Sequence, residues 1–96
     1  MKTYSIEFHV LALKEWKKLD HSIQQQLKRL LEKRICNPHI PSARLHGDLA
    51  NFYKIKLKAQ GYRLVYEVID SKLVIIVIAV GKIDRSEIYY TASKRR

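Results

Sequence analysis

The spacing of hydrophobic residues along the chain changes period, and each change marks a new element. Residues 3–10 alternate between polar and apolar side chains, which is typical of a half-buried strand. Its apolar face consists of Tyr4, Ile6, Phe8 and Val10. From Leu11 to Leu19 the period becomes helical, because apolar residues recur at three-residue steps. The chain therefore opens with a strand followed by a helix.

A second helix is expected after "LDHS", with Ser22 and Gln25 spaced as a capping box and with Asn37 and Pro38 ending it. Its predicted buried stripe is Ile23, Leu27, Leu30, Leu31 and Ile35. The two helices would form a hairpin whose outer face is basic. The basic residues assigned to that outer face are Lys14, Lys17, Lys18, Lys28, Arg29, Lys33 and Arg34. Such a run of charges is usually a solvated surface.

Residues 38–52 contain both prolines and "HGD", which predicts a loop with a short strand near Ala43 to Leu45. Three strands follow at about 52–58, 62–69 and 73–80, separated by "AQG" and "DSK". Short connections favour an antiparallel meander, and the unbroken run "LVIIVIAV" indicates a strand covered on both faces.

Asp84 and Glu87 have the spacing of another capping box, which predicts a short C-terminal helix. The expected fold is therefore α+β, in a single domain that spans residues 1–96. An N-terminal strand, a helical hairpin, a three-stranded antiparallel meander that completes one sheet, and the short helix follow in that order.

Composition and charge narrow the possible partners. The 96 residues carry 19 Lys and Arg against 9 Asp and Glu, a net charge of +10, which favours an anionic partner, nucleic acid first and a membrane surface second. The longest apolar run is too short to cross a bilayer, and the N-terminus lacks the apolar core of a signal peptide, so we expect a cytoplasmic protein. Cys36 is the single cysteine, and we expect it to be a buried structural thiol.

The stretch "YKIKLKAQGYRLVYEV" at 53–68 is the main candidate for chemistry. Alternate residues of its first strand are the lysines Lys54, Lys56 and Lys58, which therefore share one face. If the turn uses two residues, Gln60 and Gly61, then Lys58 lies opposite Arg63, and a four-residue loop preserves the same parity. Either register keeps the tyrosines of the second strand on the apolar face, so we expect Arg63 to join the lysines.

Lysines that share a strand face lie only about 7 Å apart and repel one another. Repulsion of this kind lowers lysine pKa values, so that one lysine can act as a general base while its neighbours remain cationic. RNA cleavage suits this arrangement, because a base takes the 2′-hydroxyl proton and cations stabilise the charge on the phosphate. No metal is required, and the sequence contains no carboxylate cluster to hold one. A lysine-rich edge strand that resists aggregation has the same local pattern.

The segments "ALKEWKKLD", "YKIKLKAQGYRLVYEVID", and "VGK" followed by "RSEIY" resemble the RelE toxins of the RelE/ParE superfamily, over about residues 4–94. The resemblance implies a ribosome-dependent endoribonuclease that cuts messenger RNA in the decoding site, beside the 16S ribosomal RNA. It implies cleavage without a metal or other cofactor, leaving a 2′,3′-cyclic phosphate. It also implies a cognate, RelB-like antitoxin whose extended segment wraps the toxin.

Carried over by the same resemblance, the general base falls on Lys56, and two phosphate-stabilising cations fall on Lys54 and Arg63. The tyrosine that stacks on the nucleotide falls on Tyr89. Tyr90 is the adjacent alternative, although from the sequence alone both tyrosines are expected to be packing residues.

Two positions depart from the RelE pattern. Ile83 stands where the pattern has an arginine after "VGK", which leaves Lys82 and Arg85 as the nearest substitutes. His46 stands at a cationic position before a loop glycine. Together with Lys58, the residues Lys82, Arg85 and His46 are the candidate nucleic-acid contacts.

Two other functions remain open at this point. The sister ParE activity, which poisons DNA gyrase, does not need the face formed by the lysines and Arg63, so these residues argue against it. A nucleic-acid-binding domain without catalytic activity would use the same basic surface.

Overall fold

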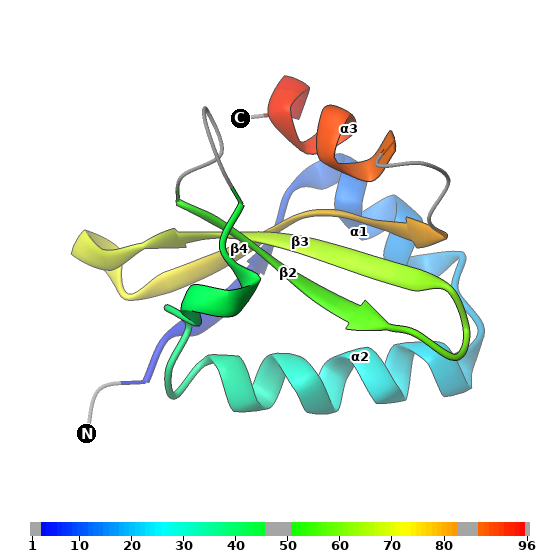
Figure 1. Ribbon diagram of the computed structural model, residues 1–96, viewed down its shortest axis with the longest axis horizontal. Helices are drawn as coiled ribbons and strands as arrows, with labels where there is room; N and C mark the ends of the chain where they lie inside the picture. The colour runs from blue at the N-terminus through cyan, green and yellow to red at the C-terminus, as the bar shows by residue number, and fades with distance from the viewer. Residues whose placement is uncertain (1–2, 46–50, 83–86, 96) are drawn as a thin grey trace.

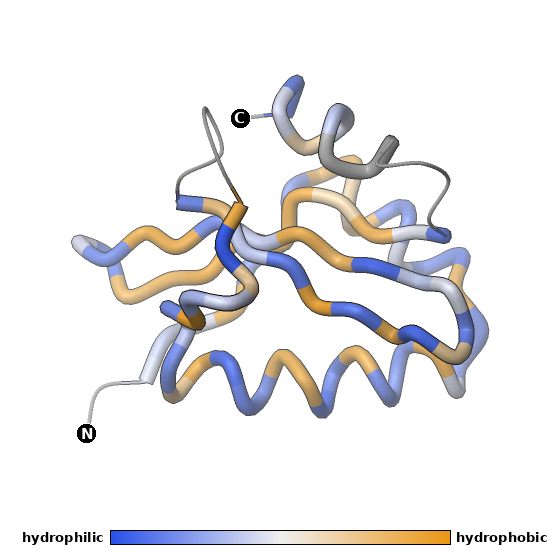
Figure 2. Tube along the Cα trace, in the orientation of Figure 1, coloured by the Kyte–Doolittle hydropathy of each residue, from blue (hydrophilic) through white to orange (hydrophobic). Residues whose placement is uncertain are grey.

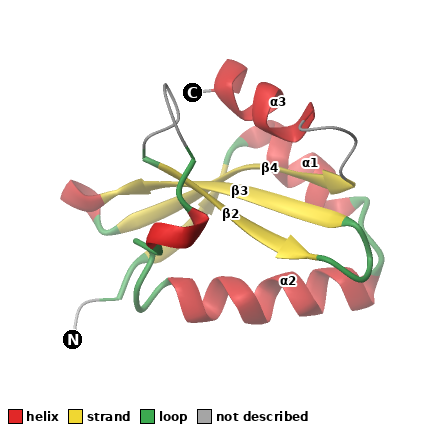
Figure 3. Ribbon diagram, in the orientation of Figure 1, coloured by secondary structure: helices red, strands yellow, loops and turns green. Residues whose placement is uncertain are grey.

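A computed structural model describes residues 3–45, 51–82 and 87–95, with the backbone alone described at 87–89. It confirms the α+β class and the predicted order of elements (Figures 1 and 3). The helices and strands are β1 (Ser5–Phe8), α1 (Val10–Lys17), α2 (His21–Arg34), β2 (Phe52–Leu57), β3 (Tyr62–Ile69), β4 (Val74–Lys82) and α3 (Glu87–Arg95). Short 3-10 helices at Pro41–Ala43 and Asp70–Lys72 precede β2 and β4.

The four strands form one sheet in the order β1-β4-β3-β2. Strands β2, β3 and β4 pair antiparallel, which confirms the meander predicted from their short connections. Strand β1 pairs parallel with the first half of β4, from Ser5 opposite Val74 to Phe8 opposite Val77. Strand β2 is therefore one edge of the sheet, and this edge carries the lysines.

Apolar side chains cover both faces of the sheet. On one face, α1 and α2 contribute Ala12, Ile23, Leu27 and Leu31 to the larger cluster. On the other face, Ala92 of α3 packs with Phe52, Val65, Ile78 and Ala79. Figure 1 shows α2 and α3 on opposite sides of the sheet. Strand β4 is buried from both sides over most of its length, as its continuous apolar sequence predicts.

The expected start of α2 and the strand expected near Ala43 are wrong. Helix α2 begins at His21 with Asp20 in the N-cap position, so Ser22 lies inside the helix and forms no capping box with Gln25. The segment near Ala43 forms a 3-10 helix that begins at Pro41. Proline fits this position, because the first N–H groups of a helix have no partner within the helix. In place of the expected strand, an isolated β-bridge joins Arg44 to Tyr53.

Cys36 is exposed, not buried. It follows the end of α2, where Ile35 and not Cys36 packs against the core. Of the helices in the described ranges, none has the length and apolar character needed to cross a membrane.

Candidate functional site

The lysines of β2 lie on the sheet face opposite the larger apolar cluster. Successive residues of β2 point to opposite faces of the sheet, and Figure 2 shows hydrophilic and hydrophobic positions alternating along this strand. Tyr53 and Ile55 are buried, whereas Lys54 is half-buried and Lys56 is exposed. Because the apolar residues have to face α2, the lysines are directed to the other side.

The register of the β2–β3 hairpin brings Arg63 to the same face, as predicted. Lys56 pairs with Arg63, and Lys54 pairs with Val65. Directly paired residues have Cβ atoms about 5 Å apart. The structure therefore places two cations, Lys56 and Arg63, side by side, with Lys54 two residues away along β2.

The hairpin has a four-residue loop. The predicted two-residue turn is therefore wrong, and the four-residue alternative, which also keeps Arg63 on the face of the lysines, is correct. Leu57 and Tyr62 are the last strand pair, and Gly61 has a φ of 73°, which glycine adopts without strain. The Gly61 amide donates a hydrogen bond of 2.9 Å to the Leu57 carbonyl. As a result Arg63 lies opposite Lys56, and Lys58 belongs to the exposed loop.

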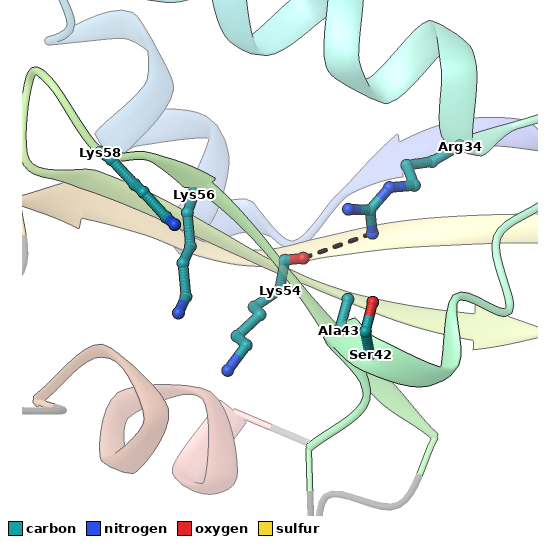
Figure 4. Close-up of a pocket in the computed structure, with 6 residues that line it drawn as sticks. All are labelled: Arg34, Ser42, Ala43, Lys54, Lys56 and Lys58. Atoms are coloured by element: carbon teal, nitrogen blue, oxygen red, sulfur yellow. Dashed lines mark hydrogen bonds between the residues drawn. The ribbon is translucent and has the colours of Figure 1, made fainter.

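A cavity of about 300 Å³ lies along the edge of β2. It is lined by Arg34, Ser42, Ala43, Lys54, Lys56 and Lys58. Figure 4 shows these six residues, with Lys54 and Lys56 extending from β2, Lys58 from the loop after it, and Arg34 reaching β2 from α2. The cavity combines four cationic side chains with one hydroxyl, which is suited to binding an anion such as a phosphate.

Arg34 is the lining residue that the sequence interpretation assigned wrongly. It was expected on the solvated outer face of the helices, but it is half-buried and turned toward the sheet. Its Nη1 atom donates to the Tyr66 hydroxyl at 2.9 Å and to the Lys54 carbonyl at 3.3 Å. Helical spacing could have revealed this, because Arg34 is seven residues after Leu27 and three after Leu31, both buried.

Lys82 lies apart from the lysine face. It pairs with Tyr62, whereas Arg63 pairs with Gly81, so Lys82 shares the face of Tyr62. Its Nζ atom lies 5.9 Å from the centroid of the Tyr62 ring. Tyr90 is 61% exposed, which contradicts a packing role, and Lys94 Nζ lies 4.7 Å from its ring centroid.

The remaining predicted site residues are not placed by the structure. Tyr89 belongs to α3, but its side chain is outside the described part of the chain. His46, Ile83 and Arg85 also lie outside the described residues.

A second polar cluster, which the sequence interpretation missed, joins the start of the chain to the loop after α2. The Tyr4 hydroxyl donates to Asp70 Oδ1 at 2.7 Å, and His39 Nε2 lies 2.7 Å from the same oxygen. His39 Nδ1 lies 2.9 Å from the Tyr53 hydroxyl. A carboxylate only accepts, so a neutral His39 donates through Nε2 and accepts from Tyr53 through Nδ1.

These contacts shift the acidities of the groups involved. The hydrogen bonds from Tyr4 and His39 lower the pKa of Asp70 from its usual 3.8. The bond to Asp70 raises the pKa of Tyr4. Burial raises the pKa of Tyr66, and the hydrogen bond and charge of Arg34 partly offset that rise. None of the residues Tyr4, His39 and Asp70 lines the cavity, and their bonds join the start of the chain, the segment after α2 and the 3-10 helix before β4.

Comparison with known proteins identifies the family. The sequence profile of the "ParE toxin of type II toxin-antitoxin system, parDE" matches residues 6–87, which is most of the chain. The chain belongs to the RelE/ParE toxin family. Within this family the relatives at high identity carry the RelE name. A RelE-like toxin protein of Escherichia coli is 56% identical over 92 residues, and the mRNA interferase toxin RelE of Escherichia coli K12 is 49% identical, each match covering 96% of both sequences.

Solved structures of RelE have the same fold. A mutant of the Escherichia coli toxin RelE in the free state matches with a TM-score of 0.89 and 47% identity, over 97% of both chains. The same toxin mutant in complex with an antitoxin RelBc peptide matches with a TM-score of 0.82 and 47% identity, over 98% of both chains. The RelE-like fold expected from the sequence is therefore confirmed.

Proposed function

We propose that this chain is the ribonuclease toxin of a type II toxin–antitoxin pair and cuts messenger RNA in the decoding (A) site of the ribosome, which inhibits translation. The observation that carries the proposal is the face formed by Lys54, Lys56 and Arg63, in a chain about half identical to an mRNA interferase. The cytoplasm is the compartment in which such a toxin meets ribosomes.

In this mechanism Lys56 is the general base. Its neutral amine takes the proton of the 2′-hydroxyl, the 2′-oxygen bonds to phosphorus, and the bond from phosphorus to the 5′-oxygen breaks. The leaving 5′-oxygen takes a proton from a general acid, so the products are a 2′,3′-cyclic phosphate and a 5′-hydroxyl. Lys54 and Arg63 remain cationic and stabilise the charge that develops on the phosphate, so the reaction does not depend on a metal. Tyr89 stacks on the nucleotide and holds it in place.

The ribosome supplies the geometry that a small cationic face lacks. In-line attack requires the 2′-oxygen, the phosphorus and the leaving oxygen to be aligned, and a pre-aligned reactant can account for several kcal/mol of the barrier. The cavity lined by described residues measures about 300 Å³, so it can hold a phosphate but cannot enclose and bend an RNA strand. We therefore expect the decoding site, with its 16S ribosomal RNA, to hold the message, and a RelB-like antitoxin to neutralise the protein.

To test the proposal, the protein is incubated with a defined messenger RNA on translating ribosomes and, in parallel, with the same RNA free in solution. The 5′ ends of the fragments are then mapped. We expect cuts within the codon in the decoding site and none on the free RNA. Efficient cutting of free RNA would refute ribosome dependence. Binding without cutting would indicate a silent nucleic-acid-binding domain, and inhibition of gyrase supercoiling without RNA cleavage would indicate the ParE activity.

A further inference from the structure

The proposed catalytic lysines lie on the edge strand of the sheet, where only one side of the backbone is paired along β3. On the other side of β2, near its start, the Leu45 amide donates to the Phe52 carbonyl at 2.9 Å. An edge strand with few partners can shift or fray. Any such movement of β2 would displace Lys54 and Lys56, because both side chains emerge from it.

Arg34 holds the next exposed carbonyl of this strand. Its Nη1 donates to the Lys54 carbonyl at 3.3 Å, a contact that Figure 4 shows as a bridge from α2 to β2. The same nitrogen donates to the Tyr66 hydroxyl at 2.9 Å. The guanidinium carbon lies 5.8 Å from the centroid of the Tyr66 ring. One side chain of α2 therefore joins the edge strand to the centre of the sheet.

The anchor of this contact is rigid. Tyr66 is completely buried, and its hydroxyl donates to the Pro38 carbonyl at 2.7 Å while it accepts from Arg34. Its ring stacks on that of Tyr53, with 5.6 Å between centroids and 16° between planes. Tyr53 directly precedes Lys54 along β2. Two contacts therefore hold β2 at the first lysine: the bond from Arg34 to the Lys54 carbonyl and the stacking of Tyr53 on Tyr66.

We propose that Arg34 is a positioning residue for the cleavage reaction, which acts by holding β2 through the Lys54 carbonyl so that Lys56 meets the 2′-hydroxyl. This inference rests on the proposed role of Lys56 as the general base. A guanidinium suits the task better than an ammonium, because its planar fork of donors is pre-organised and always charged. A displacement of a catalytic group by about 1 Å can reduce a rate by about 100-fold.

Arg34 also lines the cavity, so direct contact with a phosphate is the competing role. The two roles differ in what they change. Loss of a contact with a phosphate that does not react weakens ribosome binding in a salt-dependent manner and leaves the rate at saturation intact. Loss of a positioning contact lowers the rate at saturation and changes binding little.

The test uses Arg34→Met, which keeps the aliphatic stem but removes the donors and the charge, and Arg29→Met, which removes the same charge from an exposed position of α2. For each variant, the single-turnover cleavage rate at saturating programmed ribosomes and the ribosome affinity are measured at a temperature where the protein is folded. We expect Arg34→Met to lose about 10- to 100-fold in rate and no more affinity than Arg29→Met. Arg34→Lys should not restore the rate.

Tyr66→Phe provides a second test if Arg34→Met does not fold. It removes the hydroxyl that Arg34 contacts but retains the buried, stacked ring, and we expect a partial loss of rate at saturation. A normal rate at saturation in either folded variant overturns the inference, and a loss confined to affinity assigns Arg34 to phosphate binding. Lys56→Ala, assayed alongside, separates the two proposals: if it cleaves normally, the proposed site is wrong whatever Arg34 does.

Discussion

Lys56 and Lys58 are two residues apart in the sequence but lie in different backbone environments. Lys56 is in β2, paired directly with Arg63, whereas Lys58 lies in the exposed four-residue loop. Strand pairing holds the backbone of a residue in place, whereas the backbone of a loop is more mobile. A general base needs the first environment, whereas a cation that only attracts RNA tolerates the second.

Lys56→Ala should therefore lose more cleavage rate than Lys58→Ala. A positioned general base contributes about 100- to 10,000-fold, whereas a peripheral cation mainly adds salt-sensitive affinity. Single-turnover cleavage on programmed ribosomes measures the first effect, and ribosome affinity at two salt concentrations measures the second. Equal rate losses in the two variants would contradict the role assigned to Lys56.

At the scale of elements, the Tyr4–His39–Asp70 cluster fastens three segments that are distant in the sequence. Tyr4 precedes β1, His39 follows α2, and Asp70 begins the 3-10 helix after β3. The Tyr4 amide also donates to the Ile35 carbonyl at 2.9 Å, which ties the same segments together. These bonds lie at the end of the sheet where β2 begins and β3 ends.

The lowered pKa of Asp70 makes the contribution of this cluster dependent on pH. The contribution should be present above pH 3.8, the value of a free aspartate, and should be lost as the pH falls through the lower pKa of the folded state. Asp70→Asn should therefore destabilise the protein at neutral pH and lose that effect in strong acid. The raised pKa of Tyr4 acts in the opposite range, since its contribution is lost as the pH rises above 10.0 and through the folded-state value.

Urea unfolding of Asp70→Asn and the parent protein at several pH values checks this expectation. Glu32→Gln, which removes a carboxylate from an exposed position on α2, is the matched control. A constant difference in unfolding free energy between Asp70→Asn and the parent at every pH would show that the charge of Asp70 is not what stabilises the cluster.

At the scale of the whole molecule, one ion pair joins the first helix, the last helix and the sheet. Arg95 of α3 contacts Glu15 of α1 through two hydrogen bonds of 2.8 and 3.0 Å, and it donates to the Ile78 carbonyl at 2.9 Å. Glu15 also accepts from the Val80 amide at 3.2 Å. Both backbone groups belong to the part of β4 that lies beyond its pairing with β1. The pair therefore supplies partners where the sheet lacks a strand.

Arg95→Met should lower the free energy of unfolding by about 1 to 3 kcal/mol, because it leaves Glu15 and the Ile78 carbonyl without a charged partner. The Arg95 side chain is only 14% exposed and that of Glu15 35%, so solvent screens the pair less than a surface pair. A double-mutant cycle with Glu15→Gln measures the coupling, and Arg29→Met controls for the loss of charge. Simple additivity of the two changes would contradict a direct interaction.

The amino-acid sequence by itself determined the elements, the meander and the face on which the lysines lie. Hydrophobic periodicity is a local property, so alternation in β2 and β3 was enough to place Lys54, Lys56 and Arg63 together, whichever even loop length the hairpin used. The same local reasoning was wrong about the start of α2, where Asp20 and Ser22 are both acceptable N-cap residues and the sequence does not choose between them.

Only the tertiary structure decided which residues far apart in the sequence meet. The parallel pairing of β1 with β4, the partners of Arg34 and the partners of Asp70 all depend on contacts across more than ten residues. Helical spacing places Arg34, but not Lys33, on the buried side of α2, and the partner that Arg34 meets there depends on where α2 ends relative to β2. Packing geometry, which no local pattern encodes, therefore determines what holds the lysine face in place.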